Sequence, residues 1–215
     1  QKDGKDELLE KIENLSTMAN IFYVRQNRPK GLGHAILKAK PFIGDDPFVI
    51  ALGDDIVDNP ERPVAKQLID VYEKYGSSIV GCQEVEEKDI SKYGIVKPIE
   101  RLDESTCVIE DFIEKPSIEE APSNFACLGR YLLTGKIFKY LEEVKPGKGG
   151  EIQLTDAILD MLKDGERVLS YNFEGKRYDI GNKVGLLKAN IEFGLKNEET
   201  REGLLKYLKT ELKLD

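Results

Sequence analysis

Residues 47–55 read PFVIALGDD, and this stretch decides the fold of the 215-residue chain. The five consecutive apolar residues at 48–52 give the strongest strand signal in the sequence, and the glycine and two aspartates after them mark its end. In open α/β sheets, ligands bind beyond the carboxyl ends of the strands. A polar segment directly after a buried strand therefore predicts a binding site at this end of the sheet.

Strands and helices alternate on both sides of this run. The expected elements are helices at 64–75 and 151–163 and strands at 21–24, 78–82 and 168–173. This alternation predicts an α/β fold with a doubly wound, mostly parallel, Rossmann-like sheet. From about 93 to 133 the pattern changes to strand, turn and strand, which predicts a β-rich insertion, and two closing helices are expected within 182–215. Because no repeat or linker divides it, the chain 1–215 is interpreted as a single domain.

Composition and charge exclude several classes of protein. Forty per cent of the residues are apolar, which is enough for a core and argues against a disordered or fibrous chain. The net charge of −8 argues against nucleic-acid binding, which needs a basic face. No window approaches the ~18 apolar residues of a membrane span. Three cysteines without a CxxC pair are typical of reduced thiols, so we expect a cytoplasmic protein.

Three predicted strand ends carry the charged candidate residues. Asp54 and Asp55 are adjacent carboxylates, which suit Mg²⁺ together with the phosphates of a ligand. Glu114 and Lys115 place a carboxylate beside a cation, a pair able to orient a sugar hydroxyl and a phosphate. Asp179 is a candidate second carboxylate for the same ion. Each of these residues is also compatible with a plain turn or helix cap.

Two glycine-containing stretches complete the candidate site. Gln26 offers both a donor and an acceptor, as reading the edge of a base such as uracil requires. Gly31 would let the backbone approach a flat ring, and the Gly94 amide could donate to a sugar hydroxyl. His34 is the single histidine and is interpreted as a packing or capping residue, because no serine or cysteine nucleophile motif lies beside it.

Seven stretches of the chain carry a resemblance to a known family. They are QNRPKGLGHA (26–35), PFVIALGDDIV (47–57), SKYGIV (91–96), EDFIEKP (110–116), APSNFACLGRYLLT (121–134), GGEIQLTDAI (149–158) and FEGKRYDIGNKVG (173–185). In this order they resemble the bacterial UTP–glucose-1-phosphate uridylyltransferases, a branch of the sugar nucleotidyltransferases. The pair GGEIQLTDA and FEGKRYDIG is typical of this glucose-uridylyl branch, and the glucose-1-phosphate thymidylyltransferases are less similar.

The resemblance implies a Mg²⁺-dependent reaction in which UTP and glucose 1-phosphate give UDP-glucose and pyrophosphate. The implied roles are uracil contacts for Gln26 and Gly31, metal ligation for Asp54 and Asp179, sugar contacts for Gly94 and Glu114, and a phosphate contact for Lys115. Asp55 is counted with the substrate-binding residues. The 93–133 region would then be the sugar-binding part of the domain.

One feature of the resembled family does not occur between Gln1 and Asp215. The family opens with a strand and a Gly-rich GxGxR loop around the triphosphate, and no such stretch is found. The first strands of the family fold, roughly 70–80 residues in two βα units, are therefore expected ahead of Gln1. Without them, the chain is expected to expose strand edges or borrow a strand, and to be inactive by itself.

Two other functions stay open at this point. One is a non-catalytic, sugar-nucleotide-binding regulatory homologue, and the other is a glucose-1-phosphate thymidylyltransferase. A homo-oligomer is also expected. An apolar stripe near the end of the chain could pack within the domain, which is favoured, or across a two-fold axis: Leu204, Leu205, Leu208 and Leu212.

Overall fold

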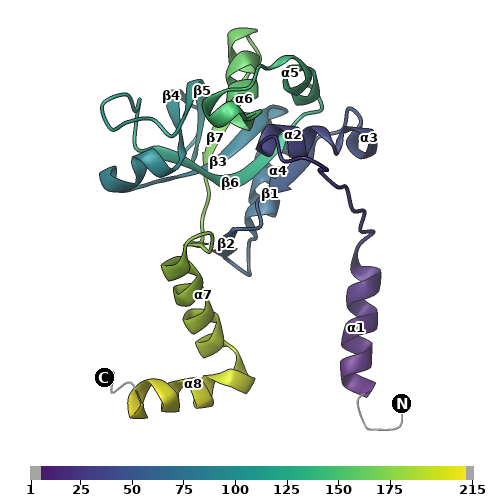
Figure 1. The fold of residues 1–215 in the computed structure, drawn as a ribbon, viewed down its shortest axis with the longest axis vertical. Helices are drawn as coiled ribbons and strands as arrows, with labels where there is room; N and C mark the ends of the chain where they lie inside the picture. The colour runs from purple at the N-terminus through teal and green to yellow at the C-terminus, as the bar shows by residue number, and fades with distance from the viewer. Residues whose placement is uncertain (1–5, 212–215) are drawn as a thin grey trace.

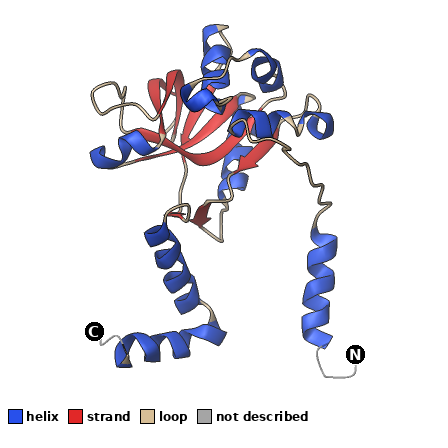
Figure 2. Ribbon diagram, in the orientation of Figure 1, coloured by secondary structure: helices blue, strands red, loops and turns tan. Residues whose placement is uncertain are grey.

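The structure is a computed structural model that describes residues 6–211 (Figures 1 and 2). In chain order its elements are α1 (Asp6–Met18), α2 (Leu32–Leu37), α3 (Lys40–Ile43), β1 (Phe48–Ala51), β2 (Asp55–Asp58), α4 (Val64–Tyr75), β3 (Ser78–Glu84), the 3₁₀ helix η1 (Glu87–Lys92), β4 (Gly94–Arg101), β5 (Thr106–Glu114), β6 (Phe125–Leu133), α5 (Ile137–Glu143), the 3₁₀ helix η2 (Lys148–Gly150), α6 (Leu154–Lys163), β7 (Val168–Asn172), β8 (Lys176–Asp179), α7 (Lys183–Lys196) and α8 (Glu198–Thr210).

The main sheet has six strands in the order β1-β6-β3-β7-β5-β4, and β4 also pairs with the start of β6. The predicted α/β class is confirmed, but the expectation of a mostly parallel sheet is wrong. Among the described strands only β3 and β7 pair in parallel. β1, β3 and β7 do run in one direction, as helix-linked strands should, but β6 enters antiparallel between β1 and β3 and β5 pairs antiparallel with β7.

Helices cover both faces of this sheet and build two hydrophobic clusters. On one face α2, α5 and α6 pack against the sheet around Phe138 and Ile158. On the other face α4 contributes Val64, Leu68 and Val71. The sheet alternates between the clusters, because successive side chains of a strand point to opposite faces. The molecule is therefore layered as helix, sheet and helix, with the strand ends free to carry polar residues (Figure 2).

The predicted β-rich region is confirmed as β4, β5 and β6, but it is not a separate insertion. Its last strand lies inside the main sheet, between β1 and β3. Gly129, with φ +67°, coincides with the register shift at Gly81/Cys82 in the pairing of β3 with β6. This bulge directs the Gly129 carbonyl toward the loop after β1, where it accepts a hydrogen bond of 3.0 Å from the Leu52 amide.

One prediction near the N-terminal end differs from the structure. The apolar run 21–24, expected to be a buried strand, is irregular and exposed, with Tyr23 91% accessible. It pairs with no described strand, and β1, the edge of the sheet, has no partner on its outer side among residues 6–211.

The helices at the two ends extend away from the sheet layer (Figure 1). The two closing helices were predicted and are present as α7 and α8. Core packing of the leucine stripe was favoured, but no described residue of α8 is buried, and Leu205 is 38% exposed. Leu212 of that stripe lies outside the described residues. No helix within 6–211 is both long enough and apolar enough to cross a membrane.

Candidate active site

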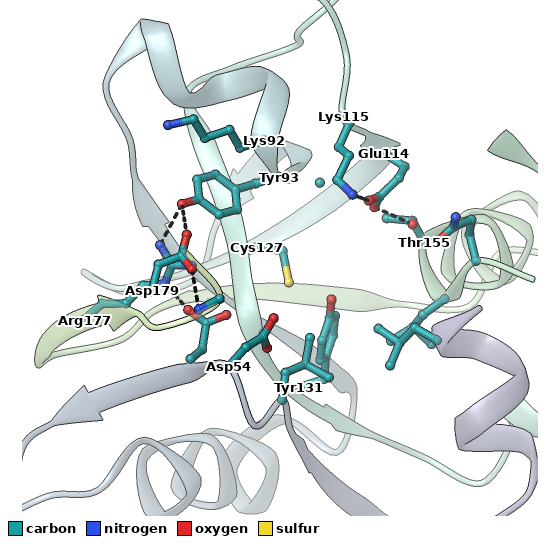
Figure 3. Close-up of a pocket in the computed structure, with 18 of the residues that line it drawn as sticks. Asp54, Lys92, Tyr93, Glu114, Lys115, Cys127, Tyr131, Thr155, Arg177 and Asp179 are labelled. Atoms are coloured by element: carbon teal, nitrogen blue, oxygen red, sulfur yellow. Dashed lines mark hydrogen bonds and ion pairs between the residues drawn. The ribbon is translucent and has the colours of Figure 1, made fainter. Parts of the chain in front are cut away.

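A polar cavity of about 500 Å³ opens where the predicted strand ends meet. Of the eight residues that the sequence singled out for the site, six line it: Asp54, Asp55, Gly94, Glu114, Lys115 and Asp179 (Figure 3). They come from the loop after β1 and the first residue of β2, from the start of β4 and the end of β5 with the residue after it, and from the last residue of β8. The strand-end argument therefore brings together segments that are more than a hundred residues apart in the chain.

Two carboxylates, those of Asp54 and Asp179, face a common point in this cavity. Asp54 Oδ2 and Asp179 Oδ1 each lie 3.3 Å from the position that a Cβ of Gly181 would occupy. The loop is held by a backbone hydrogen bond of 2.9 Å from Ile180 N to Asp54 O. Within the described residues, no group of three or more His, Cys, Asp and Glu side chains could hold a metal. Two carboxylates are the donor set with which proteins hold Mg²⁺ when ligand phosphates supply further oxygens, so these residues fit such an ion.

Asp55 lies beside this pair but is occupied by an internal partner. Arg177 Nε donates to Asp55 Oδ1 at 2.5 Å, and both side chains are largely enclosed, at 14% and 10% exposure. Burial raises the pKa of the Asp55 carboxyl above its ordinary value, and the hydrogen bond from Arg177 opposes this rise. An Arg177 side chain that is always charged therefore neutralises Asp55 inside the site.

The opposite side of the cavity is formed by the end of β5 and the start of β4. Gly94 pairs with Glu114 across the ladder, and Lys115 N donates to Tyr93 O at 3.1 Å. Lys115 is the one non-glycine residue with positive φ in the described chain, at +47°. A conformation of this kind costs energy and is found at ligand-binding sites. This conformation turns the chain sharply after β5. The ammonium of Lys115 lies 3.6 Å from Glu114 Oε1.

Gln26 and Gly31 lie outside the residues that line the cavity. Gln26 Nε2 donates to Gly31 O at 3.3 Å and lies 2.6 Å from His34 Nδ1. Burial and the nearby charges of Lys38 and Lys30 lower the pKa of His34, which favours a neutral ring that accepts at Nδ1. The single histidine thus holds Gln26, in agreement with a packing role. Gly31 adjoins Leu32, which does line the cavity.

The cysteines offer no nucleophile to this site. All three are free thiols within the described chain, and Cys82 and Cys127 are buried. Burial raises the pKa of the Cys127 thiol, the one that borders the cavity, to about 12. A thiol with such a pKa is protonated at neutral pH and does not attack an electrophile.

Among the residues of the cavity wall that sequence reasoning missed are Tyr93, Thr155 and Arg177. A signal existed for Arg177, since it stands two positions before Asp179 and alternate residues of a strand share a face. Tyr93 precedes the candidate Gly94 directly. Thr155 lies in a motif, GGEIQLTDAI, that was used only for the resemblance. The pairing of the four-residue strands β2 and β8, which brings Asp55 opposite Asp179, was not predicted.

Comparison with known proteins places the chain in a family. Residues 1–194 match the nucleotidyl transferase family. The chain belongs to the nucleotidyl transferases. Enzymes of this family generally use a divalent metal ion.

Three nucleotidyl transferases illustrate the similarity. UTP–glucose-1-phosphate uridylyltransferase 2 of Staphylococcus saprophyticus is 49% identical over 215 residues, which are 100% of this chain and 73% of the relative. A solved UDP-glucose pyrophosphorylase in complex with UDP-glucose superposes with a TM-score of 0.84 and 43% identity, covering 92% of this chain and 74% of the other. UTP-bound UGPase from Acinetobacter baumannii gives a TM-score of 0.80 and 30% identity, with 98% and 73% covered.

Proposed function

We propose that this nucleotidyl transferase makes UDP-glucose and pyrophosphate from UTP and glucose 1-phosphate. The observation that carries the proposal is 49% identity along the whole chain to a UTP–glucose-1-phosphate uridylyltransferase. A polar cavity containing two converging carboxylates, a lysine and a glycine backbone is suited to a phosphorylated sugar and a nucleotide.

The reaction needs no nucleophile from the protein. An oxygen of the glucose 1-phosphate attacks the α-phosphorus of UTP, the bond from that phosphorus to the bridging oxygen breaks, and pyrophosphate leaves with the electron pair. Transfers of this kind depend on positioning and on neutralising negative charge. The protonated thiol of Cys127 is compatible with such a direct displacement, because no covalent intermediate is required.

The residues of the cavity divide between the two substrates in this proposal. Lys115 contacts the phosphate of the sugar, Glu114 accepts from a glucose hydroxyl, and the Gly94 amide donates to another. Asp54 and Asp179 hold Mg²⁺, which when bound would neutralise charge on the phosphates. The opposed positions of Glu114 and Asp179 in the cavity wall support this division, because they leave room for a substrate between them (Figure 3).

The uracil of UTP is assigned to Gln26 and the Gly31 backbone. A Cβ at Gly31 would lie 2.6 Å from Ile152 O, and the φ of Gly31 is +99°, so this position admits glycine alone without strain. This close approach is to the backbone of Ile152, so the glycine is required by packing within the chain, and the uracil contact of Gly31 stays a prediction. Asp55 was predicted to bind substrate. In the structure its carboxylate is paired with Arg177, and a contact with substrate stays a prediction.

Two further proposals concern the state of the protein. A homo-oligomer is supported by apolar side chains exposed along α7, such as Val184 at 61% and Leu187 at 62%. Light scattering of the purified full-length protein would measure the oligomeric state, and a monomer at micromolar concentration would contradict the proposal.

A cytoplasmic location is supported by three free thiols, which persist where the compartment is reducing. Cell fractionation would test this location.

The test of the function is pyrophosphate release by the full-length protein with UTP, glucose 1-phosphate and Mg²⁺. We expect turnover that Asp54→Asn abolishes and that Asp160→Asn, on the exposed surface of α6, leaves intact. Faster turnover with dTTP than with UTP would favour the thymidylyltransferase alternative. Binding of UDP-glucose without any pyrophosphate release would favour the regulatory homologue. Near-normal activity of Asp54→Asn would contradict the assignment of the metal pair.

A further inference from the structure

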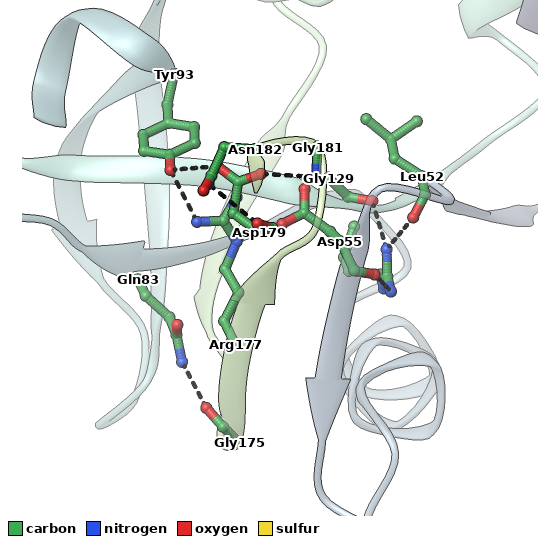
Figure 4. A network of polar contacts seen from close by, with 11 residues as sticks. Leu52, Asp55, Gln83, Tyr93, Gly129, Gly175, Arg177, Asp179, Gly181 and Asn182 are labelled. Atoms are coloured by element: carbon green, nitrogen blue, oxygen red, sulfur yellow. Dashed lines mark hydrogen bonds and ion pairs between the residues drawn. The ribbon is translucent and has the colours of Figure 1, made fainter. Parts of the chain in front are cut away.

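A chain of polar contacts connects Arg177 to the carboxylate of Asp179 through a tyrosine (Figure 4). Arg177 Nη1 donates to the Tyr93 hydroxyl at 3.0 Å, and that hydroxyl donates to Asp179 Oδ2 at 3.3 Å. The guanidinium also lies over the Tyr93 ring, 4.7 Å from its centroid. The ring and the guanidinium therefore fix each other through two contacts of different kinds.

The direction of this chain of contacts is set by chemistry. A guanidinium has donors and no acceptor, so the Tyr93 oxygen must accept from Arg177. The single proton of the hydroxyl is then left to point at Asp179 Oδ2. The other oxygen, Asp179 Oδ1, accepts from Gly181 N at 3.1 Å. Each carboxylate oxygen thus has one donor and retains lone pairs for a cation.

Asp55 completes the arrangement by carrying the charge of the arginine. Arg177 pairs with Asp55 at 2.5 Å and reaches Asp179 only through Tyr93 among the contacts described. Asp179 therefore keeps its negative charge for a metal ion. Asp55 neutralises the guanidinium of Arg177, which would otherwise repel that metal ion. The backbone supports the same geometry, because Asp55 lies opposite Asp179 in the pairing of β2 with β8. Gln83 holds the turn before β8 through a hydrogen bond of 3.2 Å to Gly175 O.

We propose that Arg177 is a positioning residue that, through the hydroxyl of Tyr93, orients the Asp179 carboxylate for a divalent cation. The inference deepens the proposed function, on which the metal role of Asp179 rests. Arg177 touches neither substrate nor metal in this scheme. Its effect is exerted on the rotamer of Asp179, since partners behind a metal ligand fix its orientation.

The test is direct binding of Mn²⁺, without nucleotide or sugar, to the full-length protein, followed by electron paramagnetic resonance. Tyr93→Phe removes one oxygen and keeps the ring under the guanidinium, so we expect Mn²⁺ affinity to fall about 10- to 100-fold. Tyr178→Phe is the matched control, because Tyr178 donates to Glu192 at 2.7 Å on the opposite face of β8. The control should keep the affinity of the unaltered protein.

Arg177→Lys tests whether the arginine acts through the tyrosine. The lysine keeps the charge beside Asp55 but lacks the planar fork that reaches Tyr93. We expect Arg177→Lys to weaken Mn²⁺ binding, and the double variant with Tyr93→Phe to bind no more weakly than Tyr93→Phe alone. Losses that multiply in the double variant would overturn the proposal.

Two other results would also overturn it. One is an unchanged Mn²⁺ affinity in Tyr93→Phe, and the other is a full-length protein that binds no Mn²⁺. Failure of the proposed function is a separate outcome. It would be absence of pyrophosphate release from UTP and glucose 1-phosphate, and the Mn²⁺ measurement uses neither substrate.

Discussion

The hydroxyl of Thr155 donates a hydrogen bond of 2.8 Å to Glu114 Oε2, from the first turn of α6 to the last residue of β5. Thr155 is buried, at 4% exposure, so this contact is sheltered from water. The other oxygen of Glu114 lies 3.6 Å from Lys115 Nζ. Both carboxylate oxygens therefore have a partner, and the orientation of Glu114 toward Gly94 is fixed before any ligand arrives.

Substitution of Thr155 by valine should weaken catalysis with glucose 1-phosphate while sparing UTP. Valine keeps the branched shape but leaves Glu114 Oε2 without its donor, at a cost of roughly 1–3 kcal/mol. We expect kcat/KM for glucose 1-phosphate to fall roughly 5- to 100-fold, with little change in the KM for UTP. Thr200→Val, at the exposed junction of α7 and α8, is the control. Equal loss for both substrates would argue against a sugar-specific role for Glu114.

Asp103 should make the protein sensitive to acid. Its Oδ2 accepts from the Tyr75 hydroxyl at 2.7 Å and from Lys74 Nζ at 3.0 Å, which ties the β4–β5 turn to the end of α4. Burial acts to raise the pKa of Asp103, but the hydrogen bonds from Tyr75 and Lys74 outweigh it and hold that pKa well below the ordinary value. The folded state therefore favours the charged form. The resulting stability is present above an unfolded pKa of ~3.9 and is lost as the pH falls toward the folded pKa.

The variant Asp103→Asn should lose about 1–2 kcal/mol of unfolding free energy at pH 7. Urea unfolding at pH 7 and again below pH 4 measures the effect. The difference between the variant and the unaltered protein should shrink at the lower pH, because the Asp103 carboxyl of the unfolded chain then takes up a proton, which stabilises the unfolded state. A difference that is the same at both pH values would show that the charge of Asp103 is not what stabilises the turn.

Gln26 should control the use of UTP alone. The amide is held by Gly31 O at 3.3 Å and by His34, so its orientation is set within the loop before α2. Gln26→Ala should raise the KM for UTP about 10-fold, as expected for the loss of one or two hydrogen bonds to a base. The KM for glucose 1-phosphate should stay as it is. A change in the sugar-phosphate KM of the same size would mean that Gln26 supports the cavity rather than the base.

Elements whose bounds are determined by residues within a single segment were predicted correctly. The bounds of α4 agree with the prediction, because Val64, Leu68 and Val71 repeat at helical spacing and Gly76 takes the left-handed conformation that ends the helix. The strand ends were also predicted from residues within one segment, and in the structure they place Asp54 and Glu114 in one cavity. In both cases the pattern of apolar and polar residues determines the outcome.

Features that depend on distant partners were not predicted. β2 and β8 are four residues each, and their pairing joins Asp55 to Asp179 across most of the chain. The apolar run 21–24 has strand propensity but no described partner, so its hydrophobicity alone did not make it a strand. The ion pair of Asp55 with Arg177 gives one of two adjacent aspartates a separate partner, which spacing alone does not reveal.

Gly94 provides the sharpest steric prediction for the side of the cavity that is proposed to bind the sugar. A Cβ at this position would lie 2.6 Å from Phe112 Cε2 and 3.2 Å from Glu114 Oε2. Phe112 is 2% exposed and belongs to the core, so its ring has little freedom to move away. Gly94→Ala must then displace either the core ring or the carboxylate, and we expect a loss of about 1–3 kcal/mol in stability together with weaker use of glucose 1-phosphate.

Gly203→Ala is the matched control for Gly94→Ala and should have the opposite sign. Gly203 lies within α8, and a Cβ there would meet nothing within 4 Å. Alanine favours the helix over glycine by about 1 kcal/mol, so this variant should unfold at a slightly higher temperature with unchanged kinetics. Calorimetry and initial rates on both variants separate packing from substrate contact. A Gly94→Ala protein with normal stability and a normal KM for glucose 1-phosphate would mean that the ring of Phe112 moves aside, and would contradict the proposed contact of the Gly94 backbone with the sugar.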